Sequence, residues 1–520
     1  MKTEITVDGK KHRIKRSAAG LIRAGITAIA LIIQVAVLAL FVFIVNYYAP
    51  WLYLVVEILS IIFVFGLVYD EQNYNHFWIV IILVLPVMGF ILYFLWGRKR
   101  TNSRRNKQFR EINEEISKAL GTNEAALIRT HELHPYKSQI HRYLANEGFP
   151  VYERTKVTYY PLGEPYGEDL IQDLKTAKQY IFMEYFILQD GEFWQSVYEV
   201  LREKVKEGVQ VKLLLDDFGS LIVNTREFRK DLVQNGIEIG IFAPIHQELT
   251  RLTCNYRSHE KITIIDGNVG YTGGINIADE YINKLVRFGH WKDSGIRMEG
   301  PGVFPLTCFF LEMWQITNKI PKIDFRNYLP TKQVPEAIGF VQPFADGPSN
   351  NPRNPAEGVY THMIEKAREY LYITTPYLVP DRRMVEDLIR AAKSGVDVRI
   401  ITPRHYDKWY VYMVTVSNYG ELVRGGVKIY EYVPGFIHQK NVIVDDTMAI
   451  CGTINMDFRS FYLHYEDAVL MTGMPQVMEM KDDFTETLKV CEQIQLEKWE
   501  KRPLRHKFMQ GVLRIFSPLL

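Results

Sequence analysis

Two short runs of the chain combine residue types that can transfer a phosphoryl group. Both place His, Lys and Asp in the order H-x-K-x4-D, and an Asn follows 17 residues after the His. The residues are His259, Lys261, Asp266 and Asn276 in the first run, and His438, Lys440, Asp445 and Asn455 in the second. Each fixed position matches by chance about once in twenty, so two copies at equal spacing are a specific signal.

The residues between His and Asp alternate between apolar and polar in both runs, which predicts a strand. On a strand, side chains two residues apart point to the same face, so each His and its Lys share one face. The Gly-Gly or Gly-Thr turn that follows allows close approach of the backbone, and the Asn returns a polar group to that face. One copy therefore supplies half of a phosphodiester site, and two facing copies complete it.

Two imidazoles around one phosphate suit a two-step displacement. One His attacks phosphorus and the other protonates the leaving oxygen, then deprotonates the acceptor hydroxyl that attacks the phosphohistidine. The two lysines and two asparagines would neutralise the non-bridging oxygens, a task for which many enzymes use a metal. We therefore expect no metal and no cofactor. Asp266 and Asp445 are catalytic candidates, and the alternative is that they hold the turns after the strands.

Each His also needs a carboxylate to fix its tautomer. Asp293 in the string GHWKD and Glu466 in LHYED stand at similar positions after their motifs. We expect these two to be the supporting carboxylates. The alternative is ordinary surface charge.

Strand and helix patterns alternate around both motifs in the same order. This predicts an α/β fold, with mixed sheets flanked by helices and duplicated domains. The expected strands of the first half are 180–187, 209–217 and 237–242, and those of the second are 370–377, 396–403 and 427–432. A Pro- and Asn-rich passage near 330–352 predicts the boundary between the halves.

Three apolar runs precede this part, at 24–45, 51–69 and 77–96. Each approaches the roughly 20 residues that cross a bilayer as a helix. Lys and Arg cluster before the first run and after the third, and the loops between the runs have none. The positive-inside rule then places both flanks in the cytoplasm, which requires an even number of crossings. We expect two crossings plus one re-entrant or interfacial segment. Pro86 and Gly89 make the third run the candidate.

Net charge, cysteine content and the two basic segments give further expectations about partners and environment. A net charge of +2 argues against a general nucleic-acid binder. The four scattered cysteines, which are Cys254, Cys308, Cys451 and Cys491, are expected to be reduced thiols. The basic stretch 98–130 is expected to be a linker facing anionic lipids. The last residues, 501–520, are basic and amphipathic, and are expected either to lie on the membrane or to pack as a final helix.

The paired motifs resemble those of the phospholipase D superfamily, and the chain is similar to bacterial cardiolipin synthases over nearly its whole length. The strings that carry this resemblance include GGINIADEY (273–281), GHWKDSGIRMEGPGV (289–303), GFIHQKNVIVDD (435–446) and GTINMDFRSFYLHYE (452–466). Two departures stand out. Glu260 replaces a usual Arg beside the first motif, and His464 stands where Asn is usual.

The resemblance implies that two phosphatidylglycerol molecules yield cardiolipin and glycerol, with His259 as nucleophile and His438 as general acid/base. The sequence alone does not distinguish this from the reverse assignment. Expected partners are phosphatidylglycerol and other anionic membrane lipids, without nucleic acid and with a possible homo-oligomer. A phospholipase D-type hydrolase, a transferase for another headgroup, a nucleic-acid phosphodiesterase and a non-catalytic scaffold are the alternatives.

Five segments are expected from these observations. They are a membrane-anchoring helical region (1–97), a basic linker (98–130), a first phospholipase D-like domain (131–330), a second such domain (331–500) and an amphipathic tail (501–520). The expected location is the cell membrane, multi-pass, with the catalytic domains on the cytoplasmic face.

Overall fold

The structure is a computed structural model. It describes residues 3–7, 10–14, 36, 39–40, 42–44, 46–69, 75–94, 104–245, 255–351, 353–515 and 517. The first apolar run, the basic residues at 98–103 and Cys254 lie largely or wholly outside these ranges.

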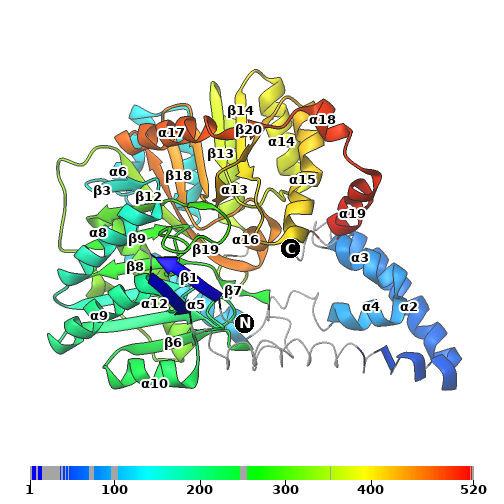
Figure 1. Cartoon of the computed structure of the whole chain (residues 1–520), viewed down its shortest axis with the longest axis horizontal. Helices are drawn as coiled ribbons and strands as arrows, with labels where there is room; N and C mark the ends of the chain where they lie inside the picture. Colours follow the sequence, from blue (N-terminus) through cyan, green and yellow to red (C-terminus); the bar gives the residue numbers. More distant parts are fainter. Residues whose placement is uncertain are drawn as a thin grey trace.

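A seven-stranded mixed sheet forms the first half of the α/β body (Figure 1). Its central pair is antiparallel, and the strands that follow on one side are parallel. The order is β3 (Lys156–Tyr160), β11 (Gly295–Glu299), β9 (Val269–Gly273), β8 (Lys261–Ile265), β4 (Tyr180–Tyr185), β5 (Gln210–Asp216) and β6 (Glu238–Phe242).

The second sheet repeats this order strand for strand and adds one edge strand. It runs β12 (Phe340–Asp346), β19 (His464–Thr472), β18 (Met448–Gly452), β17 (Asn441–Val444), β13 (Tyr370–Thr374), β14 (Asp397–Pro403), β15 (Lys428–Tyr432) and β20 (Cys491–Gln493). Strand β8, which lies within the first motif, therefore corresponds to β17, which lies within the second. The duplication read from the sequence is present in the topology.

Helices cover both sheets, as the alternating pattern predicts. In the first half they are α8 (Gly163–Lys175), α9 (Glu192–Lys206), α10 (Arg226–Gln234) and α12 (Phe304–Asn318). In the second they are α13 (Pro355–Lys366), α14 (Arg382–Lys393), α15 (Trp409–Arg424), α16 (Phe458–Tyr462) and α17 (Pro475–Leu488).

Two helices join the halves. Helix α12, buried from Phe304 to Trp314, contacts strands of the first sheet and also β12 of the second. Helix α17 does the reverse, contacting the second sheet and β3 of the first. The largest hydrophobic core accordingly includes residues of both halves. Burial of this apolar surface is the main free energy that holds the halves together.

The described part of the predicted linker is mostly helical, but it is not a free spacer. Helix α5 (Arg104–Leu120) packs against α12, with Phe109, Ile112 and Ile116 buried. Helices α6 (Glu124–Leu133) and α7 (Ser138–Asn146) follow, and α7 packs against α13. In the sequence, the many charged residues of α5 made its apolar stripe hard to recognise. This stripe packs against the body and holds α5 in place.

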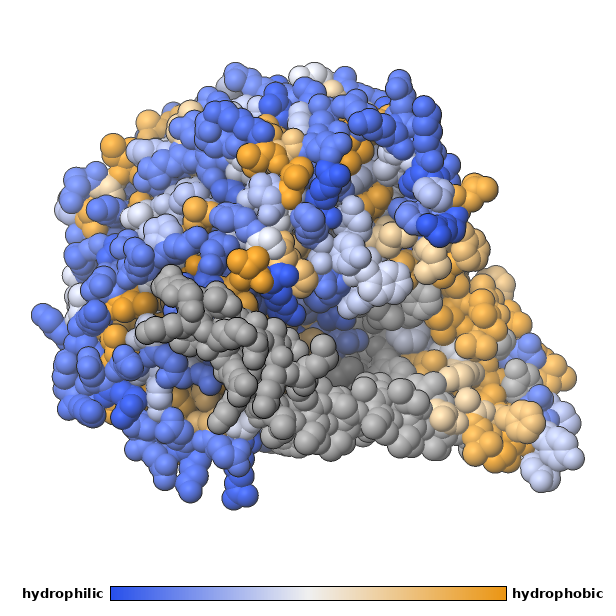
Figure 2. All heavy atoms as spheres, viewed as in Figure 1, coloured by the Kyte–Doolittle hydropathy of each residue, from blue (hydrophilic) through white to orange (hydrophobic). Residues whose placement is uncertain are grey.

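The apolar region contains helices α2 (Pro50–Tyr69), α3 (Asn75–Val84) and α4 (Pro86–Leu92). Within the described residues, one helix, spanning Pro50–Val68, is long and apolar enough to cross a membrane. The third run is broken at Pro86 into α3 and α4, and both pack against α2. The bend expected at Pro86 is therefore present. Figure 2 shows apolar side chains gathered over these helices, beside the more polar body.

The chain ends in α18 (Leu496–Glu500) and α19 (Leu504–Ile515). Helix α19 packs against α15, and the view in Figure 1 draws it next to α3. Its Leu504 and Phe508 are 81% and 71% exposed. The helix is thus docked on the body along one side and presents apolar side chains on another, which combines features of both expectations for the tail.

Candidate active site

The two motifs hold their His and Lys at the start of equivalent strands. Lys261 opens β8, and Lys440 immediately precedes β17. In each motif the lysine Nζ donates a hydrogen bond to the main-chain carbonyl of the His two residues earlier. All four side chains are buried. The strand and shared face read from the sequence are confirmed, although each His lies just before its strand begins.

Two short parallel strand pairs connect the halves directly beside these histidines. Strand β16 (Gly435–Ile437) pairs with β10 (His290–Lys292), and β7 (Arg257–Ser258) pairs with the start of β19. Immediately after the first pair of strands, His438 stands opposite Asp293, and immediately after the second pair, His259 stands opposite Glu466. His438 N–H donates to the Lys292 carbonyl, and His259 N–H donates to that of Tyr465, at 2.7 and 2.8 Å.

Each motif His is therefore oriented by a carboxylate from the other half. His438 Nδ1 is 2.6 Å from Asp293 Oδ2, and His259 Nδ1 is 2.8 Å from Glu466 Oε2. Both carboxylates are fully buried. The sequence placed both acids after their own motifs but gave no indication of the exchange, because it depends on strand pairing between the halves. With Nδ1–H donated to a carboxylate, the lone pair of each imidazole is on Nε2.

The electrostatics indicate that the motifs converge on one site. Burial and the Lys261 ammonium hold the pKa of His259 well below its ordinary value, and Lys440 and His438 lower it further. Burial, then Lys440, lowers the pKa of His438 to about 4, and Lys261 contributes. Each His is thus affected by the lysine of the opposite motif. Both imidazoles are neutral at neutral pH, the form that can act as a nucleophile.

The two lysines are also perturbed. Burial lowers the pKa of Lys261 to about 7 and that of Lys440 to about 8, against attraction from the nearby carboxylates. A buried ammonium is disfavoured until an anion arrives, so a bound phosphate would restore its charge. The site is consequently suited to an anionic phosphodiester.

The two motif asparagines lie in this buried region with unused hydrogen-bonding capacity. Asn276 Oδ1 accepts from the Ile187 N–H at 2.9 Å, and its Nδ2 has no hydrogen-bond partner among the described residues. Oδ1 of Asn455 is likewise unpartnered there. Buried polar groups without partners are uncommon, and a substrate can satisfy them.

Asp266 and Asp445 lie at the opposite ends of the strands from the histidines and fit the turn-holding alternative. Both have positive φ, 52° and 48°. Each carboxylate accepts hydrogen bonds from three consecutive backbone N–H groups at 2.7 to 2.9 Å. For Asp266 these belong to Lys178, Gln179 and Tyr180, and for Asp445 to Arg368, Glu369 and Tyr370. Lys137 also pairs with Asp445 at 2.7 Å. This geometry supports the turn-holding alternative for both aspartates.

Several residues around the histidines were not singled out from the sequence. The Phe186 ring packs edge-on against His259, with centroids 5.0 Å apart, and Tyr281 does so against His438 at 5.5 Å. Ser460 Oγ donates to Glu466 Oε1 at 2.7 Å. Phe186 lies in an apolar run that indicates core, and Tyr281 and Ser460 fall within the strings that resemble the family without a residue type that marks them individually.

The two departures from the family pattern are both buried. Glu260 lies in an acidic group with Glu184, and burial raises its pKa well above the ordinary value. His464 contacts the His259 ring at a centroid distance of 5.4 Å. Its Nδ1 is 3.6 Å from Glu466 Oε1, and neither ring nitrogen makes a hydrogen bond to the described residues.

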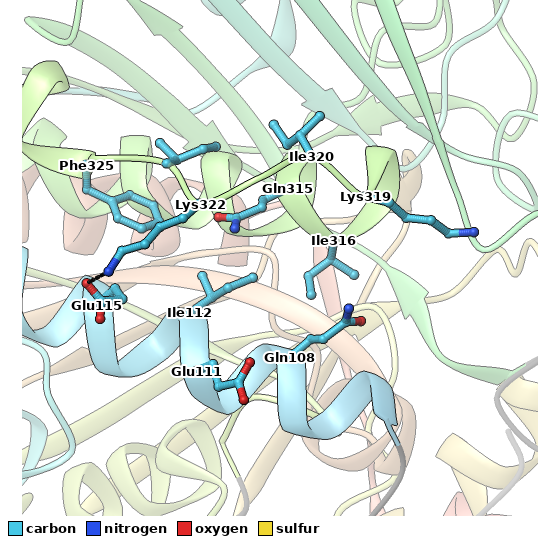
Figure 3. Close-up of a pocket in the computed structure, with 11 residues that line it drawn as sticks. Gln108, Glu111, Ile112, Glu115, Gln315, Ile316, Lys319, Ile320, Lys322 and Phe325 are labelled. Carbon is cyan, nitrogen blue, oxygen red and sulfur yellow. Dashed lines mark ion pairs between the residues drawn. The ribbon is translucent and has the colours of Figure 1, made fainter.

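A separate pocket lies between α5 and α12 (Figure 3). Its described lining includes Gln108, Glu111, Gln315 and Lys319, and an ion pair of 2.8 Å joins Glu115 to Lys322 at its edge. No histidine is among these lining residues, so this pocket lacks the groups needed for phosphoryl transfer.

Comparisons with known proteins agree with this geometry. A family model described as the cardiolipin synthase PLD-like domain matches residues 170–285 and 360–488, which contain both motifs. A second model, described as the phospholipase D-nuclease N-terminal region, matches 58–98. A protein of Halalkalibacterium halodurans named cardiolipin synthase is 35% identical over 85% of this chain and 88% of its own. The chain belongs to the cardiolipin synthase family.

Other relatives match this chain as extensively. Cardiolipin synthase 2 of Staphylococcus epidermidis is 32% identical over 89% of this chain and 96% of its own length. An uncharacterized protein of Streptococcus mutans is 38% identical over 85% and 96%. Among solved structures, the phosphatidylserine synthase of Haemophilus influenzae superposes with a TM-score of 0.56 at 15% identity, covering 73% of this chain and 97% of that one. That likeness concerns the fold.

Proposed function

We propose that this chain is a cardiolipin synthase, which transfers a phosphatidyl group from one phosphatidylglycerol to another and releases glycerol. The observation that carries the proposal is the crossed pair of His–carboxylate contacts beside two buried lysines. It provides two imidazoles of fixed tautomer for one phosphate. Membership of the cardiolipin synthase family supplies the substrate class.

In the first step, Nε2 of His259 attacks phosphorus of the donor lipid, and the P–O bond to the glycerol headgroup breaks. His438 gives a proton to the leaving oxygen, so glycerol departs and a phosphatidyl-histidine remains. The phosphodiester anion favours the protonated form of His438, whose pKa is about 4 in the free site. The lysines and asparagines would balance charge on the non-bridging oxygens.

In the second step, a headgroup hydroxyl of another phosphatidylglycerol attacks the same phosphorus. His438 removes the hydroxyl proton, the N–P bond breaks, and His259 is regenerated with its lone pair. Cardiolipin is the product. Glu466 and Asp293 act as positioning residues, since each fixes the proton on Nδ1 and stabilises a charged imidazole.

We further propose a multi-pass membrane enzyme with its α/β body on the cytoplasmic face. Support comes from the length and apolarity of α2, from the broken third run that packs on it, and from the basic residues that flank the region. Helix α19 carries the exposed apolar residues Leu504 and Phe508, which would contact the same lipid surface.

The test uses the purified full chain in mixed micelles with phosphatidylglycerol and excess chelator, while cardiolipin and free glycerol are measured together. Equal amounts of the two products are expected. Phosphatidic acid with glycerol, and no cardiolipin, would instead identify a hydrolase. The same assay on His259→Ala should show no turnover, and substantial residual activity would refute the assigned nucleophile.

A further inference from the structure

His464 is a buried imidazole that the proposed mechanism does not use. It is 8% exposed, its ring stacks obliquely near that of His259, and both of its ring nitrogens lack a hydrogen-bond partner among the described residues. A buried polar ring without a partner is unfavourable, so its position beside an anion-binding site points to a ligand.

The donor atoms of His259, His464 and Glu466 form a compact group. One nitrogen from each ring and one carboxylate oxygen all lie within 4.8 Å of one another. His259 Nδ1 is 2.8 Å from Glu466 Oε2, and His464 Nδ1 is 3.6 Å from the other oxygen, Oε1. Tetrahedral zinc with ligands at about 2.0 to 2.2 Å sets its donor atoms about 3.4 Å apart, which is within the 4.8 Å spread of this group.

We propose that His259, His464 and Glu466 form a binding site for a divalent ion of the zinc type. Two imidazoles and one carboxylate are a ligand set that zinc uses in proteins when a fourth position stays open. Ser460 already orients the carboxylate through Oε1 at 2.7 Å, and Phe186 packs against both rings. Such surrounding groups fix ligand geometry and restrict water.

Zinc at this site would block the transferase reaction, and this consequence rests on the proposed function. A neutral imidazole has a single ring lone pair. Once His259 donates that pair to a metal, it has none left to attack phosphorus. The ion is therefore an inhibitor of the reaction, and the site would make phosphatidyl transfer sensitive to free zinc.

The binding test needs no lipid turnover. Metal-free full-length protein in neutral detergent is titrated with Co²⁺, whose visible absorption reports low-coordinate binding, and Zn²⁺ is then added as competitor. His464→Asn is compared with His405→Asn, which makes the same change at an exposed histidine. We expect one Co²⁺ per chain, displaced by Zn²⁺. Affinity should fall at least about tenfold in His464→Asn and stay unchanged in His405→Asn. Equal binding by His464→Asn and the parent protein would overturn the site.

The activity test measures cardiolipin formation against free Zn²⁺, relative to the rate of each variant in chelator. The half-inhibitory concentration should rise at least about tenfold in His464→Asn and not in His405→Asn. A parent enzyme that binds Co²⁺ but is not inhibited would refute the inhibitory role. If no cardiolipin forms under any condition, the proposed function fails, and the Co²⁺ titration still decides the metal site.

Discussion

Replacement of Asp293 by asparagine tests how the proton on His438 is held. Asp293 Oδ2 is 2.6 Å from His438 Nδ1, and its other oxygen accepts from the Ser294 N–H at 2.8 Å. A backbone N–H can only donate, so the amide oxygen of the asparagine must take the Ser294 side. The amide NH2 then faces His438. A donor in that place requires a lone pair on Nδ1 and moves the ring proton to Nε2.

Lys440 reinforces this switch. Its Nζ is 2.9 Å from His438 Nδ1, so once the carboxylate is gone two donors face that nitrogen. With its Nε2 protonated, His438 can no longer accept the hydroxyl proton in the second step. The same replacement next to the histidine of a serine protease lowers kcat by about 10⁴. We expect a loss of about 10³ to 10⁴ here, which is about 4 to 5.5 kcal/mol of transition-state stabilisation.

The matched comparison is Glu466→Gln at the other histidine. There the second oxygen, Oε1, accepts from the hydroxyl of Ser460, which can rotate and accept from an amide instead. The glutamine can thus turn its oxygen to His259 Nδ1–H and keep the tautomer. Only the charge is lost, and a decrease of about 10 to 100-fold is expected.

The assay is the initial rate of cardiolipin and glycerol formation, with melting temperatures recorded to confirm that both variants fold. We expect Asp293→Asn to lower the initial rate at least tenfold more than Glu466→Gln does. Equal losses, or less than a tenfold decrease for Asp293→Asn, would show that His438 is not held by the tautomer constraint described.

Further outcomes follow from the same geometry. The pKa values of Lys261 and Lys440 are lowered to about 7 and 8, so the free site loses its positive charge as pH rises through this range, and kcat/KM should fall there. Bound phosphate restores the ammonium forms, so the decrease in kcat should occur at higher pH. A pH profile of both parameters checks this, and an alkaline limb at the same pH for both would contradict it. The acid limb of kcat/KM should lie well below the ordinary pKa of a histidine, because the attacking lone pair is lost only when His259 takes up a proton, and burial beside Lys261 holds the pKa of His259 far below its usual value. Asp445→Ala should lower the free energy of unfolding by about 1 to 3 kcal/mol, because three backbone N–H donors and Lys137 lose their partner. The kcat of the folded fraction should change less than about threefold. A large loss of kcat at an unchanged melting temperature would instead indicate a catalytic role for Asp445.

The local part of the site and much of the fold could be predicted from the sequence. Motif spacing predicted β8 and β17, the shared face of His and Lys, and the duplicated strand order, because these depend on periodicities of two and on short-range turns. It could not predict that Asp293 serves the histidine of the other half, since that contact is made by strand pairing over 145 residues of chain. The position of Asp445 beside the second motif left both a catalytic and a turn-holding interpretation open, and it is the hydrogen-bond geometry that supports the second.

The crossed carboxylates have a consequence for how the two halves depend on each other. Neither half contains a complete proton-handling unit, so a half expressed alone would have a motif His with no acid to orient it. If the chain is divided near residue 335, each piece alone should lack transferase activity, and activity should appear only when the two pieces associate. The arrangement resembles a symmetric dimer joined into one polypeptide. Loss of the carboxylate from one repeat therefore leaves the motif histidine of the other repeat without its orienting partner. Both copies must therefore be retained together, which accounts for two intact motifs in a chain that performs one reaction.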